Sequence, residues 1–154
     1  MKYFIYLFLV STISPVMAET NANDYSYVLD IVESLKVIIH KEKDKKASRT
    51  ELSRITGAKP LMKDNQYQGH QVIHDRELNG FIGIDFRDNK PLIAVYSSPP
   101  LRVRKATRRY KEFRSLLLKR YKEREYNLFD LGDQVTARLK KQARKVSIEV
   151  SRKR

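Results

Sequence analysis

The sequence predicts an α+β fold in which helices pack on one face of an antiparallel sheet. Apolar residues recur at helical spacing over about residues 24–43 and 102–124. Residues 81–97 instead carry alternating apolar side chains interrupted by turn residues, which is typical of consecutive strands. A short strand meander has one apolar face, and helices that flank it in sequence can cover that face.

Residues 1–18 have the pattern of a cleavable signal peptide. Lys2 gives a positive start, an apolar run covers residues 4–13, and Val16 and Ala18 occupy the small-residue positions before the expected cleavage site. The run is shorter than the roughly 18 residues of a membrane-spanning helix. An uncleaved anchor or a buried N-terminal helix is the competing interpretation, but the order of charge, apolar run and small residues favours export.

The expected mature chain, residues 19–154, is one domain without a transmembrane segment, located in the periplasm or secreted. It contains no cysteine, which excludes disulfides, thiolate metal sites and a lipid anchor at the cleavage site. Export without disulfides favours a bacterial envelope protein.

The N-terminal part is predicted as two helices. The first covers about residues 24–43, with Asn23 or Asp24 as its N-cap. Its apolar residues share one face: Val28, Ile31, Val32, Leu35, Ile38 and Ile39. A second, short helix is expected over about residues 49–56, where Ser48 and Glu51 form a capping box.

The centre is predicted as a three-stranded meander over residues 66–77, 81–87 and 91–97, with turns at Asn79-Gly80 and Asp88-Asn89. A two-residue loop at Asp88-Asn89 gives these cross-strand pairs: Phe86 with Pro91, Ile84 with Ile93, and Ile82 with Val95. The sheet is expected to stop at Pro99 and Pro100, which cannot donate ladder hydrogen bonds.

The C-terminal part is predicted as two helices and a possible fourth strand. The first helix covers residues 102–124 and has an apolar stripe made of Val103, Ala106, Tyr110, Phe113, Leu117 and Tyr121. The second is expected over about residues 131–144, with Leu131, Val135, Leu139 and Ala143 facing inward. Val146, Ile148 and Val150 alternate with polar residues, which indicates the strand.

The charge is concentrated at the C-terminal end. Residues 19–101 hold 12 Lys/Arg and 12 Asp/Glu, whereas residues 102–154 hold 19 Lys/Arg and 6 Asp/Glu. This asymmetry predicts an anionic partner for the C-terminal part. The expected binding residues are Arg104, Lys105, Arg108, Arg109, Lys111, Lys119, Lys122 and Arg124. The competing interpretation is a solvated helix face.

We therefore expect a non-enzymatic binding protein. Its partner is an acidic protein, as for an inhibitor or immunity protein, or an anionic lipid or polymer of the envelope. Export and the placement of the aromatic residues among the core positions make nucleic acid less favoured. A third interpretation is membrane association, which would require the apolar stripe of residues 103–121 to face lipid.

The alternative function is an exported hydrolase or nuclease. His70 and His74 share one face of their predicted strand, and a two-residue loop at Asn79-Gly80 would place His74 opposite Asp85. Such a trio suits general acid–base chemistry or metal binding. The competing interpretation is a polar strand surface with one cross-strand ion pair. The same register also puts Asp75 and Glu77 on the apolar face, which indicates a bulge or a different loop, and either would dissolve the trio. No cofactor or metal motif occurs, and none is expected.

Overall fold

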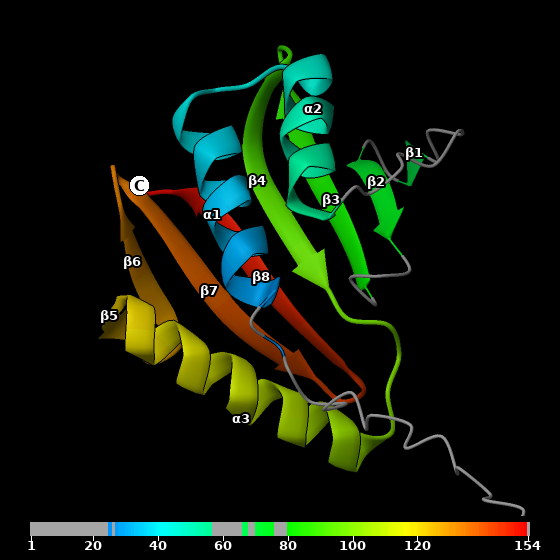
Figure 1. The fold of residues 1–154 in the computed structure, drawn as a ribbon, viewed down its shortest axis with the longest axis vertical. Helices are drawn as coiled ribbons and strands as arrows, with labels where there is room; N and C mark the ends of the chain where they lie inside the picture. The colour runs from blue at the N-terminus through cyan, green and yellow to red at the C-terminus, as the bar shows by residue number, and fades with distance from the viewer. Residues whose placement is uncertain (1–24, 26, 57–65, 68–69, 76–79, 154) are drawn as a thin grey trace, which may run out of the picture.

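The structure, a computed structural model, describes residues 25, 27–56, 66–67, 70–75 and 80–153 (Figure 1). Its three helices are α1 (Tyr27–His40), α2 (Lys45–Thr56) and α3 (Val103–Arg120). Its strands are β1 (Gln66–Tyr67), β2 (His70–Asp75), β3 (Gly80–Arg87), β4 (Lys90–Ser97), β5 (Lys122–Glu125), β6 (Leu128–Gly132), β7 (Val135–Gln142) and β8 (Lys145–Arg152). The predicted α+β class is confirmed, but the sheet has eight strands instead of three or four.

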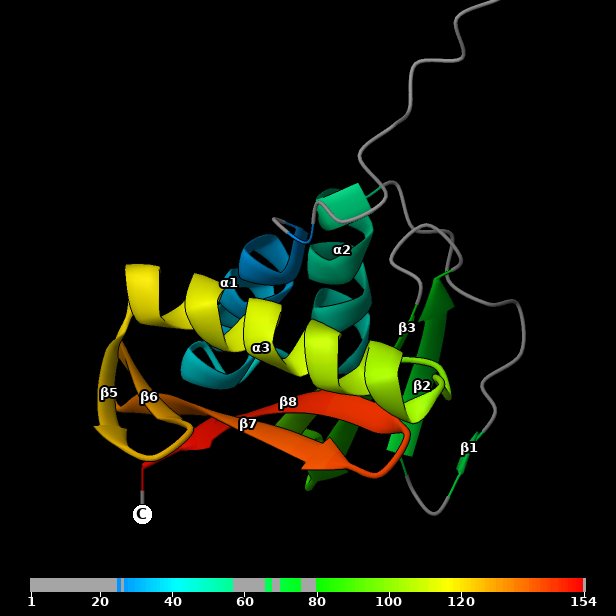
Figure 2. The ribbon, with the colours of Figure 1, turned by 90° about the horizontal axis from the view of Figure 1, so that it is seen from below.

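The sheet consists of two four-stranded meanders that meet at their last strands. Its order is β1-β2-β3-β4-β8-β7-β6-β5, and all neighbours are antiparallel. All three helices lie on one side of it (Figure 2). The core is therefore a single layer between the helices and one sheet face, and no helix of the described residues covers the other face.

The amphipathic pattern of α1 produces the centre of this core. All six apolar residues predicted to share a face are completely buried, and the helix contacts α2, β4, β7 and β8. The helix is shorter than predicted, and its predicted N-cap lies outside the described residues.

The predicted capping box of the second helix is wrong. The helix begins at Lys45, and the Ala47 backbone N–H donates to Asp44 Oδ1 at 2.8 Å, so Asp44 is the N-cap. Ser48 lies inside the first turn, where its hydroxyl donates to the Lys43 carbonyl at 3.0 Å. The Asp44 carboxylate thus caps the helix four residues before Ser48, so Ser48 does not act as the N-cap.

The predicted register of the central hairpin is also wrong by one residue. Asp88 and Asn89 form the expected turn, with left-handed φ values of 49° and 61°, and Phe86 pairs with Pro91 as predicted. A bulge between Asp85 and Phe86 then shifts the pairing, so that Ile84 faces Ala94 and Ile82 faces Tyr96. Ala94 and Tyr96 consequently enter the core in place of Ile93 and Val95.

Two further elements differ from the prediction. Residues 66–77 contain two strands, β1 and β2, where one was expected. The predicted helix over residues 131–144 is wrong, because this segment contains the end of β6 and the whole of β7. Ala143 is exposed, whereas Leu131, Val135 and Leu139 are buried as expected, but on a sheet.

The predicted final strand is confirmed. It is β8, and Val146, Ile148 and Val150 are completely buried on its core face. It occupies the middle of the sheet between β4 and β7.

Candidate binding surfaces

Helix α3 presents a basic surface because its apolar residues are turned toward the sheet. Ala106, Phe113 and Leu117 are completely buried at the helical spacing that the sequence predicts. Tyr121 begins the extended segment after the helix, and its hydroxyl donates to Glu33 Oε1 at 2.7 Å. Burial, followed by this hydrogen bond, raises the pKa of Tyr121. The helix is thereby fixed with its other side to solvent.

Five exposed basic residues make up what we call the α3 cationic face: Arg104, Lys105, Arg108, Lys111 and Lys119. They extend over about 22 Å at roughly 1.5 Å per residue. Arg108 pairs with Glu112 at 3.0 Å. The other four form no ion pair within the part of the chain that the structure describes. This face has a high density of uncompensated positive charge.

A shallow depression of about 350 Å³ lies beside the distal half of this face. It is lined by Lys111, Arg114, Ser115, Leu118 and Lys119. Arg114 holds both carboxylate oxygens of Glu123 at 2.8 and 2.9 Å, so its charge is compensated. The two lysines thus provide the free charge of this depression, beside the exposed side chain of Leu118.

The other predicted binding residues lie elsewhere. Lys122 and Arg124 belong to β5, beyond the end of α3. Arg124 is already engaged, since its Nε donates to Asp130 Oδ2 at 2.7 Å. The prediction of Arg109 as a binding residue is wrong, because its side chain is only 7 % exposed and lies among core residues.

The surroundings of Arg109 are aromatic. Its Cζ lies 5.2 Å from the ring centroid of Tyr25, which packs edge-on against Phe113. Tyr96 lies beside Phe113, and its hydroxyl shares a hydrogen bond with that of Tyr27; burial raises the pKa of both tyrosines. Nε and Nη1 of Arg109 are buried and have no hydrogen-bond partner among the residues that the structure describes. Arg109 is therefore a core residue and cannot contact a partner at the helix surface.

Among the residues that the structure describes, acids before residue 102 pair with few of the cations of residues 102–154. Within the described ranges, one of these cations, Arg152, pairs with an acid before residue 102, namely Glu42 at 3.0 Å. Arg108 pairs with Glu112 and Arg114 with Glu123 inside this region, while Asp133 pairs with Lys36 of α1 at 3.0 Å. The charge asymmetry of the sequence therefore persists in the folded protein.

Membrane insertion through the apolar stripe of α3 does not fit the packing. The stripe residues Ala106, Phe113 and Leu117 contribute to the core, while Val103 at the helix start is 59 % exposed. No helix of the described ranges is long and apolar enough to cross a membrane. An interaction of α3 with lipid would thus be restricted to charged head groups.

The strand register rearranges the proposed histidine site. His70, and not His74, lies opposite Asp85, while His74 lies opposite Phe81. The reason is that Asp75 pairs with Gly80, which a two-residue loop at Asn79-Gly80 would not allow; Asn79 itself lies outside the described residues. The described part of the chain contains no group of three His, Cys, Asp or Glu residues that could hold a metal ion.

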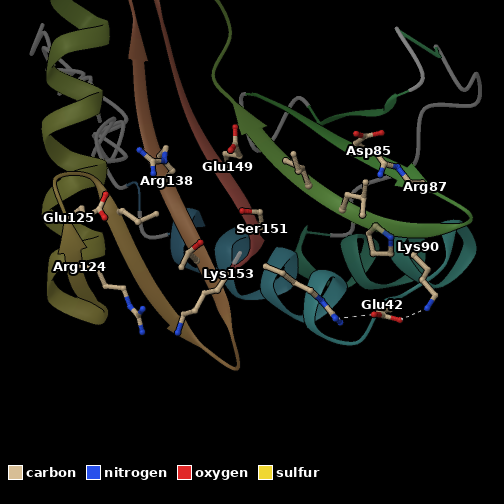
Figure 3. Close-up of a pocket in the computed structure, with 16 residues that line it drawn as sticks. Glu42, Asp85, Arg87, Lys90, Arg124, Glu125, Arg138, Glu149, Ser151 and Lys153 are labelled. Carbon is tan, nitrogen blue, oxygen red and sulfur yellow. Dashed lines mark ion pairs between the residues drawn. The ribbon is translucent and has the colours of Figure 1, made fainter.

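A second surface, which the sequence did not reveal, lies on the sheet face opposite the helices. It is a hollow of about 990 Å³, and we call it the sheet hollow (Figure 3). Its lining includes Ile93, Arg138, Glu149 and Ser151. These residues alternate with core residues of β4, β7 and β8, so their side chains point away from the helices. In the sequence, the alternation of Thr136 and Arg138 with apolar neighbours could have indicated a strand with one polar face.

Several residues that line the sheet hollow form ion pairs. Glu42 accepts from Lys90 at 3.1 Å and from Arg152 at 3.0 Å, and these contacts, led by the Lys90 hydrogen bond, lower the pKa of Glu42. Dashed lines in Figure 3 mark these ion pairs of Glu42, one of which leads to Lys90. Lys153 pairs with Asp130 at 3.1 Å on the β6 side. Arg87 and Arg138 have no ion-pair partner among the residues described.

Comparison with known proteins does not assign the chain to a group. No protein-family model, curated protein or solved structure matches it. The surfaces described above are therefore the basis on which a function can be argued.

Proposed function

We propose that the protein is an exported, non-enzymatic binding protein whose α3 cationic face recognises an anionic partner. One observation carries the proposal: Arg104, Lys105, Lys111 and Lys119 are exposed on one helix without an acidic partner in the described chain. Removal of the signal peptide, residues 1–18, would place this surface in the periplasm or outside the cell.

The physical argument rests on the density of like charges. Cations along one rigid helix create a local potential that attracts polyanions and speeds their encounter. Such charges normally occur with interspersed acids when they serve only solubility. At physiological ionic strength the screening length is about 8 Å, so binding requires several cations to be close to the partner at once. A helix surface of about 22 Å meets this requirement.

A pair of charge-matched variants tests the proposal. Arg104→Glu with Lys111→Glu reverses two charges of the α3 cationic face. Lys41→Glu with Lys46→Glu reverses two exposed charges near the junction of α1 and α2, and so changes the net charge equally. The probes are phosphatidylglycerol vesicles, a sulfated polysaccharide and polyglutamate, which stand for lipid, polymer and acidic protein. Binding is measured by titration at increasing salt.

We expect the native protein to bind at least one probe, with an affinity that falls as salt rises. The α3 variant should bind about tenfold or more weakly, whereas the control variant should stay within about threefold of the native protein. Equal losses in both variants would mean that only net charge matters. Failure of all three probes to bind at low salt would refute the proposal.

A further inference from the structure

The sheet hollow has the chemical character of a protein-binding surface. An antiparallel sheet commonly exposes one polar face to water. Here the exposed face is recessed, and its lining includes Leu92, which is 37 % exposed, and the partly buried Ile93 and Leu128. Apolar side chains in a recess surrounded by charged groups match the apolar core and polar rim of protein interfaces.

Arg138 is the most informative residue of the hollow. The register places Glu149 directly opposite it on β8, where a cross-strand ion pair would be favourable. The Glu149 carboxylate instead bonds Lys140, which is two residues further along β7. Arg138 is therefore exposed without an ion-pair partner in the described chain, beside Leu128, its neighbour on β6. Arginine is among the residues that contribute most to protein interfaces.

The mixture of charges in the hollow argues for a protein and against a polyanion. Its lining contains the acids Glu42, Asp85, Glu125 and Glu149 in addition to its basic residues. A polymer with only negative charges would be repelled by these carboxylates, whereas a protein surface can supply charges of both signs. Helix α3 contains a single acid, Glu112, so the α3 cationic face lacks this mixture.

We propose that the sheet hollow docks a segment of a partner protein that carries an apolar side chain next to a carboxylate. The carboxylate pairs with the Arg138 guanidinium, and the apolar side chain contacts Leu92, Ile93 and Leu128. Because this surface lies on the opposite side of the sheet from α3, the inference does not depend on the proposed anion binding.

Site-specific photo-crosslinking in the cells that make the protein tests this inference. A benzophenone amino acid replaces Leu92 in the hollow or, in a separate variant, Leu118 on α3. Each is combined with Arg138→Glu or with Lys141→Glu. Lys141 is an exposed residue of the same strand outside the hollow lining, so the two reversals are matched in charge and element.

We expect the probe at position 92 to form an adduct with one protein, which R138E abolishes and K141E preserves. After identification and purification, that protein should bind R138E about tenfold or more weakly than the native chain and K141E within about twofold. No protein adduct, an adduct with a second copy of this chain, or an adduct insensitive to R138E would overturn the inference. Reversal of the α3 charges should leave the adduct unchanged, which separates this test from that of the proposed function.

Discussion

The guanidinium of Arg109 is an unusual charge to find in the core. It contacts the Tyr25 ring, but Nε and Nη1 have no hydrogen-bond partner in the described part of the chain. A buried charge without full compensation is costly, and the cation–π contact offsets only part of this cost. Its position follows from spacing: residue 109 lies three residues after Ala106 and four before Phe113, on the buried stripe. Helical periodicity therefore overrides residue type at this position.

Replacing Arg109 with a long apolar side chain should preserve or improve stability. We expect Arg109→Met to have a free energy of unfolding equal to the native value or higher by up to about 2 kcal/mol, because it removes an unpaired charge while filling the same volume. Urea denaturation measures this difference. Lys111→Met, on the exposed side of the helix, should change stability by less than about 0.5 kcal/mol.

Two outcomes would contradict this view of Arg109. A loss of more than about 1 kcal/mol in R109M would mean that the guanidinium contributes to the fold. Weaker binding of R109M to the anionic probes, without unfolding, would mean that the residue reaches the surface after all.

At the scale of single elements, β7 shows why a helix was predicted where a strand occurs. Leu131, Val135 and Leu139 are spaced by four, which suits one face of a helix. Four is also a multiple of two, so Val135 and Leu139 lie on one face of β7, where the buried Ala137 completes the pattern, while Leu131 belongs to the neighbouring β6. Pairing with β8 along its whole length stabilises β7 as a strand, and the spacing of apolar residues in the sequence cannot reveal this partner.

The turn between β6 and β7 can be tested directly. Gly132, Asp133 and Gln134 all have left-handed φ values, of 79°, 51° and 59°. This conformation is costly for Gln134, which carries a β-carbon, but not for glycine, which lacks one. We expect Gln134→Gly to raise the free energy of unfolding by up to about 1 kcal/mol, measured by urea denaturation.

The matched control is Gln142→Gly, at the end of β7. Gln142 pairs with Lys145 and has no left-handed φ, so glycine there should lower stability by about 0.5–1 kcal/mol. If both variants lose the same stability, the φ value of Gln134 does not strain the turn.

The strands β3, β4 and β8 were the ones that the sequence pattern predicted. The turn at Asp88-Asn89 was identified from its residue types, but the bulge before Phe86 left no sequence signal and moved Ala94 and Tyr96 inward. Gly80 shows the same limit: a Cβ at Gly80 would lie 2.5 Å from Tyr96 Cε2, a contact created by tertiary packing alone. β5 was missed because its four residues are all charged.

For the molecule as a whole, the two meanders explain why two different surfaces exist. Each meander places a helix on the same side of the shared sheet, so that one outer surface is helical and the other is the bare face of strands (Figure 2). The charge asymmetry of the sequence predicted the helical surface, with five of its eight proposed residues on the α3 cationic face. The sheet hollow combines residues from both halves of the chain, so only the folded sheet brings them together.

The few acids of this basic molecule connect distant segments, which makes the fold sensitive to acid. Asp130 accepts from the Gly132 backbone N–H and from Lys153 and Arg124, and these contacts lower its pKa below the ordinary 3.8. Lys36 on α1 likewise lowers the pKa of Asp133, and Lys90 and Arg152 that of Glu42. Protonating them removes these contacts and leaves the repulsion among the cations uncompensated.

The pH dependence of stability therefore has a definite sign. A carboxylate with a lowered folded-state pKa stabilises the protein at pH values above its unfolded-state pKa, and this stabilisation is lost as the pH falls toward the folded-state value. We expect the free energy of unfolding to be nearly constant from pH 7 to about 5 and to fall steadily below about pH 4. Urea denaturation between pH 7 and 2 should show a shallower acid slope for Asp130→Asn, which is already less stable at pH 7. Asp88→Asn, at an exposed turn residue without an ion pair in the described chain, should keep the native slope. An unchanged slope in D130N would show that Asp130 does not link β6 to β5 and β8 in solution.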